Sequence, residues 1–372
     1  MSKAAELAKW GEVSTNGQVS GRRNIVINGA MNVAQRSASV TGIGAAAGYF
    51  TCDRWIIATG SSAGRFTMSQ TADGPSGFAN CLKLDCTTAD TSIAAGETLV
   101  LQQRFEGQDL QSIGKGVTGA KEVTVSFYVK ANAAFTFGLE LYDADNTRQI
   151  TKLFTTTAGW VRHELTFPAD VDDGSSPFVD DNGLSLTLGF WLHAGTTYTG
   201  GTLNTSSWAN VTHANRAAGI DSFYSSTDNN FFITGVQLEV GSVATPFEHR
   251  SFGEELQLCQ RYYEISYSYG TSEGTDTSAG LITTDSMGGD TTTAYLTHQL
   301  EYRVAKRAAP TLVFYDQAET SGKITSHATG VGTANNQTVS VEHASDKSIS
   351  MNRASGDAAN GFRFHYSATS EL

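Results

Sequence analysis

Two glycine-containing segments are the first places where the spacing of residues could support catalysis. Residues 60–64 (GSSAG) match the G-x-S-x-G pattern, in which a serine nucleophile stands on a sharp turn between a strand and a helix. Strand patterns flank the segment on both sides, at 53–59 and 65–70, so we interpret it as a hairpin loop of small residues. Residues 42–48 (GIGAAAG) loosely match a dinucleotide fingerprint, but a strand pattern follows where a helix is required, so we interpret them as a loop.

Carboxylates gather in residues 169–183 (ADVDDGSSPFVDDNG), at a spacing that could wrap a calcium ion. The glycine falls one place too early for an EF-hand loop, and no terminal glutamate follows. We therefore expect a solvated acidic loop, with weak cation binding as the alternative. None of the eight histidines forms a metal-ligating pair, so the sequence predicts neither a metal site nor a cofactor. The acidic residues of the loop are Asp170, Asp172, Asp173, Asp180 and Asp181.

Glycoside hydrolysis needs two carboxylates about 5–10 Å apart in space, and sequence alone does not measure that distance. Glu106, Glu140 and Glu164 are the candidates, since each lies in a strand pattern. No motif supports them, so we predict that the protein is not an enzyme. A polysaccharide depolymerase is kept as an alternative.

Aromatic and charged residues on the polar faces of the predicted strands are the strongest candidates for ligand binding. An aromatic ring can stack on the face of a sugar, while neighbouring charged groups bind its hydroxyls. Exposed aromatic residues also occur at subunit interfaces, and loops can bury them in ordinary packing, so both alternatives stay open. The candidate residues are Arg104, Glu106, Tyr128, Lys130, Glu140, Tyr142, Trp160, Trp191 and His193.

Alternating apolar and polar residues identify the strands that would position these side chains. In 122–131 (EVTVSFYVKA), the apolar residues from Val123 to Val129 share one face, and Tyr128 and Lys130 share the other. In 184–193 (LSLTLGFWLH), the leucines and Phe190 face one way, opposite Trp191 and His193. One buried and one solvated face per strand is typical of an antiparallel sandwich.

Ten such patterns lie between residues 24 and 250, and six more follow residue 265. Together they predict an all-β protein with two sandwiches, because short strands recur between polar loops. Residues 252–264 have helical spacing instead and predict one connecting helix. The expected organisation is an arm at 1–23, for which a frayed terminus is the alternative, a β-sandwich at 24–250, a helix at 251–264 and a smaller β-sandwich at 265–372. The ten patterns of the first sandwich are 24–28, 53–59, 65–70, 81–86, 98–106, 122–131, 135–143, 160–167, 184–193 and 231–240.

Composition excludes several classes of partner. The net charge is −12, with 25 basic and 37 acidic residues and no basic cluster, so neither nucleic acid nor an anionic membrane is an expected partner. No apolar run is long enough to insert into a membrane, and residues 1–10 lack the apolar core of a signal peptide. Four cysteines in so long a chain do not form a disulfide scaffold, so we expect free, mostly buried thiols.

Several blocks of the sequence, in order, resemble the phage tail-fibre and receptor-binding proteins that carry a jelly-roll module of the carbohydrate-binding type. The resemblance covers roughly residues 22–263, and the closing stretch, from RAAPTLVFYD to GFRFHYSATSEL, resembles the C-terminal β module of such proteins. The main blocks are RRNIVINGAMNVAQRS, FTCDRW, LQQRFEG, VTVSFYVKA and FFITGVQLEVGSVATPFEHRSFGEELQLCQRYY.

This resemblance implies a jelly-roll fold and a non-enzymatic, homotrimeric virion component that binds a host cell-surface glycan. The arm, with Leu7, Trp10 and Val13, would attach to another tail or capsid protein. The protein would be made in the host cytoplasm and released by lysis as part of the tail fibre. A capsid decoration or head-fibre protein is the alternative with the same fold. Jelly-roll modules often hold a calcium ion beside an acidic turn, but Asn28-Gly29-Ala30 and Thr234-Gly235 stand at those positions here, so the resemblance carries no calcium site.

Overall fold

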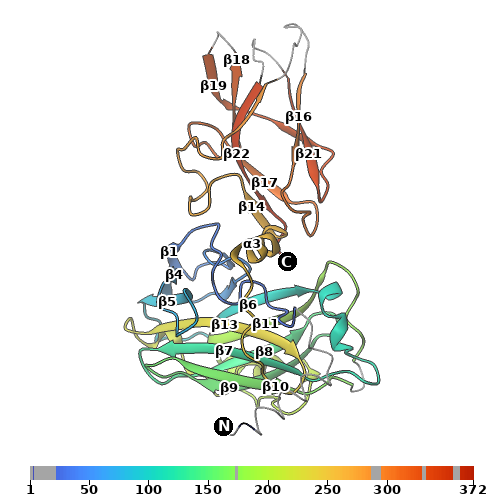
Figure 1. The fold of residues 1–372 in the computed structure, drawn as a ribbon. Coiled ribbons are helices and arrows are strands. Elements are labelled where there is room, and N and C mark those ends of the chain that lie inside the picture. Colours follow the sequence, from blue (N-terminus) through green and yellow to red (C-terminus); the bar gives the residue numbers. More distant parts are fainter. Residues whose placement is uncertain (1–2, 4–21, 172–174, 286–294, 329–331, 355–360) are drawn as a thin grey trace. The chain divides into compact units, whose positions relative to one another are not determined.

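The structure is a computed structural model in which the chain forms two compact units, each described by itself below (Figure 1). Strands account for most of the regular structure in both units. The predicted attachment residues Leu7, Trp10 and Val13 lie outside the described residues. The described residues are 3, 22–171, 175–285, 295–328, 332–354 and 361–372. The first unit comprises 1–33, 38–252 and 372, and the second comprises 34–37 and 253–371.

The first unit is a jelly-roll sandwich of two antiparallel sheets (Figure 1). Its six-stranded sheet has the order β1-β4-β5-β13-β7-β10, and its seven-stranded sheet has the order β12-β9-β8-β11-β6-β3-β2. Successive strands repeatedly cross from one sheet to the other, as jelly-roll connectivity requires. The strands are β1 Ser39–Ile43, β2 Gly48–Tyr49, β3 Ile56–Gly60, β4 Arg65–Thr71, β5 Cys81–Thr88, β6 Thr98–Glu106, β7 Val123–Ala131, β8 Thr136–Asp143, β9 Arg148–Thr155, β10 Val161–Phe167, β11 Leu184–Ala194, β12 Ala209–Asn210 and β13 Asn230–Val240.

The core between the two sheets comes from the apolar face of each strand. On β7, Val125, Phe127 and Val129 are fully buried, as the alternation predicts. Phe127 packs edge to face on Phe154 of β9, with ring centroids 5.0 Å apart, and on Phe190 of β11, at 5.1 Å. Edge-to-face aromatic pairs add to the free energy that burial already supplies, so these rings fix the spacing of the sheets. The four cysteines are buried free thiols.

Two local predictions are wrong. Residues 60–64 do not close a hairpin, because β3 belongs to the seven-stranded sheet and β4 to the six-stranded one. Ser62 is buried in this crossover, where its hydroxyl hydrogen-bonds to Asp90. Residues 24–28 form no strand, although Ile25 N–H donates to the carbonyl of Leu238. The Asn24 side chain makes the neighbouring bonds, and it therefore replaces part of a strand ladder.

The second unit is built around a central strand, β22, that pairs with β14, β15, β17 and β18. A separate three-stranded sheet has the order β16-β21-β20. Phe314, Ile349, Phe362 and Phe364 lie in the core of this unit. The elements are α3 Phe252–Gln260, β14 Tyr263–Ile265, β15 Ile282–Asp285, β16 Tyr295–Glu301, β17 Thr311–Tyr315, β18 Ile324–Ala328, β19 Gly332–Gln337, β20 Ser340–Glu342, β21 Ser348–Ala354 and β22 Gly361–Thr369.

The helix predicted at 252–264 is present but shorter. It ends at Gln260, and Tyr263 to Ile265 pair with the end of β22 as a strand. Helical spacing alone could not show this, since the pairing partner lies about 100 residues away. Within the described part of the chain, no helix is long and apolar enough to cross a membrane.

Candidate functional site

The nine residues predicted for ligand binding do not form one site. Tyr128 and Lys130 lie on β7 and Trp160 directly precedes β10, all in the six-stranded sheet. The remaining six lie on three strands of the seven-stranded sheet, so the two sheets divide the set. These six are Arg104 and Glu106 on β6, Glu140 and Tyr142 on β8, and Trp191 and His193 on β11.

The expectation that this second group is solvated is wrong for four of its members. Glu106, Glu140, Trp191 and His193 are at most 2% exposed. A segment that follows β11, containing the short helix α2 (Thr196–Thr199), covers part of this face, and Trp191 packs on Tyr198, with ring centroids 5.3 Å apart. The covering segment is rich in glycine and threonine and has no apolar periodicity, so burial under a loop was an open alternative that no sequence pattern could locate.

Glu140 is fully engaged by the protein. Arg216 donates to both carboxylate oxygens, at 2.8 and 2.7 Å, and the Trp191 indole N–H donates to Oε2 at 2.9 Å. The guanidinium lies 5.0 Å from the ring centroids of both Tyr142 and Trp191. Bidentate, partly buried pairs of this kind are strong and geometrically specific, so this cluster clamps the covering segment onto the sheet.

A serine, a histidine and a glutamate meet beside β11 in an arrangement that resembles a catalytic triad. His193 Nδ1 lies 2.8 Å from Ser222 Oγ, and its Nε2 lies 3.1 Å from Glu97 Oε2. However, Ser222 Oγ also accepts the Tyr224 N–H as a helix cap, and His193 is 0% exposed. Burial lowers the pKa of His193, against the opposing effect of Glu97. No substrate can reach the imidazole, so we assign the group to packing.

The carboxylates considered for glycoside hydrolysis are also kept apart. Glu106 pairs with Leu184 of β11, whereas Glu140 pairs with Gly189 of the same strand. Five residues along a strand span roughly 16 Å, beyond the separation that a glycosidase uses. Glu164 lies on the other sheet and pairs with Arg162 at 2.6 Å.

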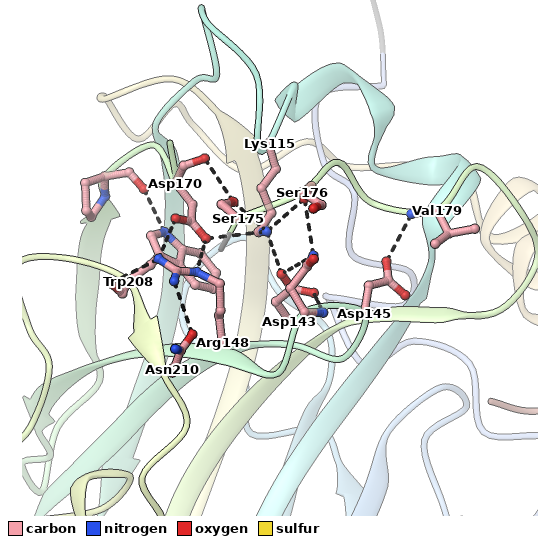
Figure 2. A network of polar contacts seen from close by, with 12 residues as sticks. Lys115, Asp143, Asp145, Arg148, Asp170, Ser175, Ser176, Val179, Trp208 and Asn210 are labelled. Carbon is pink, nitrogen blue, oxygen red and sulfur yellow. Dashed lines mark hydrogen bonds and ion pairs between the residues drawn. The ribbon is translucent and has the colours of Figure 1, made fainter. Parts of the chain in front are cut away.

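The acidic loop at 169–183 is partly a buried ion-pair network, shown in Figure 2. Asp170 is 3% exposed, and Arg148 binds it through two hydrogen bonds of 2.8 Å. The Lys115 ammonium lies 2.6 Å from Asp143 and 3.4 Å from Asp170. The prediction of a solvated loop is therefore wrong for Asp170. Asp180 and Asp181 are exposed as predicted, and Asp172 and Asp173 lie outside the described residues.

A row of alternating cationic and aromatic side chains crosses the outer face of the six-stranded sheet. Phe232 of β13 pairs with Lys83 of β5 on one side and with Lys130 of β7 on the other. Trp160, which directly precedes β10, lies beside Lys130. We call these four residues the Lys130 row. Their sequence neighbours on the same strands face the core, so the row faces outward.

Short distances join the members of the Lys130 row. The Lys130 ammonium lies 4.6 Å from the ring centroid of Phe232 and 5.3 Å from that of Trp160. Lys83 approaches Phe232 from the other side, at 5.6 Å. The two rings meet nearly edge to face at 6.3 Å. Cation–π contacts of this kind hold the lysines against the rings and fix the orientation of both.

The charges of the row are balanced by neighbouring aspartates. Lys130 pairs with Asp73 at 2.6 Å, and Lys83 pairs with Asp85 at 3.0 Å. The lysine side chains are 18% and 27% exposed, so their ammonium groups reach solvent only in part. The row thus presents aromatic rings with donors and acceptors beside them, and no nucleophile or proton-transfer pair.

Tyr128 stands next to the row, one residue pair further along the sheet. It pairs with Thr234 of β13 and with Arg162 of β10, whose guanidinium lies 5.9 Å from the Tyr128 ring centroid. Phe78 packs on its other side at 5.3 Å. Three of the nine predicted residues, Tyr128, Lys130 and Trp160, therefore come together. No sequence pattern indicated Lys83 or Phe232, because the register of β13 between β5 and β7 is what aligns them.

Comparisons with known proteins find distant likenesses only. The sequence matches no family model, and no curated protein is significantly similar to it. Similar solved structures include a family 61 carbohydrate-binding module in complex with β-1,4-galactotriose, with 12% identity over 59% of this chain and 99% of that one and a TM-score of 0.29. A family 11 module from Clostridium thermocellum, in complex with a mixed-linked tetrasaccharide, has 11% identity over 56% and 99%, and a TM-score of 0.27.

A third similar structure is the xylan-binding domain of a Paenibacillus barcinonensis protein, with 11% identity over 60% of this chain and all of that one, and a TM-score of 0.28. All three are too distant to carry an argument about the function of this chain. The fold assignment depends on the sheet topology above, and the function must be argued from this chain's own residues.

Proposed function

We propose that this protein is a non-catalytic glycan-binding protein and that the Lys130 row is its binding surface. The supporting observation is the alternation of two partly exposed aromatic rings with two ammonium groups across three adjacent strands and the residue that precedes β10. The C–H face of a sugar ring packs well on an aromatic ring, and the adjacent lysines and aspartates can bind its hydroxyl groups. Because a sheet holds the row, little conformational freedom is lost on binding.

We further propose that the protein is a virion adhesin of the tail-fibre type. Support for this finer assignment comes from the sequence blocks described above, which resemble phage receptor-binding proteins. In this proposal the protein is a homotrimer, the arm binds another tail or capsid protein, and the Lys130 row meets the glycan of the host surface.

The binding proposal is tested by substituting Trp160→Ala and Phe232→Ala and screening both variants against a glycan array. For the best glycan, titration calorimetry measures the affinity. We expect each variant to weaken binding by tenfold or more, because each loses one stacking surface. Tyr198→Ala is the matched control, since Tyr198 is a partly exposed aromatic residue of α2, on the segment that covers the seven-stranded sheet.

Two results would overturn the proposal. If Trp160→Ala and Phe232→Ala bind the array as the wild type does, the row is not the binding surface. If the wild-type protein releases reducing sugar from a polysaccharide that it binds, the protein is not merely a binding protein.

A further inference from the structure

A polar pocket lies entirely within the second unit. It has a volume of about 90 Å³ and lies where the segment after β14 approaches the turn after β17. His365 of β22 and Asp316 are buried at its base, with exposures of 2% and 3%. The lining residues are Thr275, Asp276, Thr277, Ser278, Asp316, Gln317 and His365.

Hydrogen bonds hold the side of the pocket formed by residues 274–278. The N–H of Gly274 donates to the Tyr267 hydroxyl at 3.0 Å, and His365 Nε2 bonds to the carbonyl of Thr277 at 2.9 Å. The His365 ring stacks on Tyr267, with centroids 3.9 Å apart. This side of the pocket is therefore anchored at two points, directly to His365 of β22 and to Tyr267, which itself stacks on His365.

The opposite side is fixed by the carboxylate of Asp316. It accepts backbone N–H bonds from Ala318 at 2.9 Å, from Thr320 at 2.8 Å and from Asn336 at 2.6 Å. The Asp316 carboxylate thereby holds the turn that contains Gln317 in place. A pocket with both sides fixed before a ligand arrives loses little entropy when it binds one.

Three side chains of the lining are available to a ligand. Within the described residues, no hydrogen bond or ion pair joins the side chains of Asp276, Ser278 or Gln317 to the protein, and all three are exposed. They offer a carboxylate, a hydroxyl and an amide, which can both donate to and accept from vicinal hydroxyl groups. Such groups, converging on one polar pocket, suit a small polyhydroxyl ligand.

The lining also restricts the class of ligand. Among the described lining residues, the only ionised groups are the two carboxylates of Asp276 and Asp316, which repel anions. A metal ion is disfavoured, because the oxygens of Asp316 and both nitrogens of His365 already have protein partners. The remaining match is a neutral sugar or one that carries an amino group.

We infer that this pocket is a second saccharide site, distinct from the Lys130 row, that binds a single neutral or amino-bearing sugar unit. The inference goes beyond the proposed function, since it does not require the Lys130 row to bind anything. Such a site in the second structural unit would bind one sugar residue, as at the end of a glycan chain.

Saturation-transfer NMR on the full chain tests this site, with the methyl glycosides of glucose, galactose, N-acetylglucosamine, glucosamine and glucuronic acid as probes at millimolar concentration. Gln317→Ala and Ser278→Ala change the pocket at exposed positions. Gln299→Ala, on the exposed face of β16, is the matched control. Trp160→Ala separates this site from the Lys130 row.

We expect at least one neutral or amino sugar to show saturation transfer that falls more than threefold in both pocket variants. The same signal should persist in Gln299→Ala, and the part of it that persists in Trp160→Ala should still fall when a pocket substitution is added. The inference is overturned if no probe shows transfer, if the pocket variants leave it unchanged, or if the glucuronide binds as well as the neutral sugars. Loss of the signal in Trp160→Ala alone would assign it to the Lys130 row and would equally overturn the second site.

Discussion

Lys115 is surrounded by oxygen atoms in a site where the protein supplies its own cation (Figure 2). Its ammonium lies 2.6 Å from Asp143, 2.9 Å from Ser175 Oγ and 3.1 Å from the carbonyl of Ser176, and the side chain is 2% exposed. Replacing it with methionine keeps most of the length of the side chain but leaves the buried Asp143 carboxylate without its cation. We expect Lys115→Met to lower the free energy of unfolding by about 3–5 kcal/mol.

Denaturant unfolding of the first unit measures that loss, and the exposed Lys121→Met is its control. A decrease below about 1 kcal/mol, the range of a surface ion pair, would show that the network contributes little.

His193 predicts a pH dependence with a definite sign. Burial lowers its pKa in the folded state, so the unfolded chain, with an ordinary pKa near 6.5, takes up a proton at higher pH than the folded chain does. The free energy of unfolding therefore falls as the pH drops through 6.5 towards the lower folded value. Glu97 and Asp90 oppose this shift, whereas His163 is shifted in the same direction and adds to the pH dependence.

Melting temperatures between pH 7.5 and 5.0 should consequently depend less on pH in His193→Gln than in the wild type. The exposed His213→Gln should behave as the wild type does. Equal slopes in all three proteins would mean that His193 does not contribute.

At the scale of the strand, the register shift in β13 shapes the surface beside the Lys130 row. Gly235 lies in this shift with φ +62°, and a Cβ there would stand 2.7 Å from Phe78 and 2.8 Å from Tyr128. Gly235→Ala should therefore lower the free energy of unfolding by more than about 1 kcal/mol. It should also weaken glycan binding, because both rings must shift.

Gly138→Ala on β8 is the control, since its Cβ would meet only ordinary contacts at 3.4 Å or more. Chemical denaturation and calorimetry of the two variants decide the matter. Wild-type affinity in Gly235→Ala would show that the Tyr128 side of the row does not touch the ligand.

The same scale shows which elements the sequence could predict. Alternation found β7 and β11 because their core faces are uniformly apolar. It missed β9, where the buried residues Arg148 and Gln149 interrupt the apolar pattern. It also missed β19 (GTANNQ), whose sequence has no apolar residue larger than alanine and whose place is set by pairing with β18. Strands defined by their partners carry no periodic signal of their own.

The candidate site was predictable only in part, for a related reason. Tyr128 and Lys130 were predicted because apolar and polar residues alternate regularly on β7. Trp160 was predicted because it begins the strand pattern at 160–167, and in the structure it directly precedes β10. Phe231 and Phe232 are adjacent phenylalanines on β13, and only one of them can face the core. The sequence does not show that Phe231 is the buried one and that the Phe232 ring lies on the outer face of the sheet. In contrast, Trp191 and Glu140 lie on the face of the sheet opposite the core, as predicted. They are nevertheless buried there, under a segment whose position could not be predicted from its composition.

At the scale of the whole molecule, both the net charge and the charges around the Lys130 row favour neutral glycans over anionic ones. The chain carries −12, and the lysines of the Lys130 row are each paired with an aspartate. The two lysines and their two partner aspartates sum to zero charge, so the row, on an acidic protein, attracts no polyanion. Neutral glycans are therefore the expected ligands, and their binding should change little with salt, because no long-range attraction remains to be screened.

The last prediction concerns the number of chains. The resemblance to tail-fibre proteins implies a trimer, so light scattering should give the mass of three chains at every concentration measured. Three copies of the Lys130 row would then meet a glycan-coated surface together, and the apparent affinity for that surface should exceed the affinity for the free glycan about 10²-fold or more. A mass of one chain at every concentration would contradict the trimer. In that case the surface and solution affinities should coincide, and the Lys130 row would have to act as a single site.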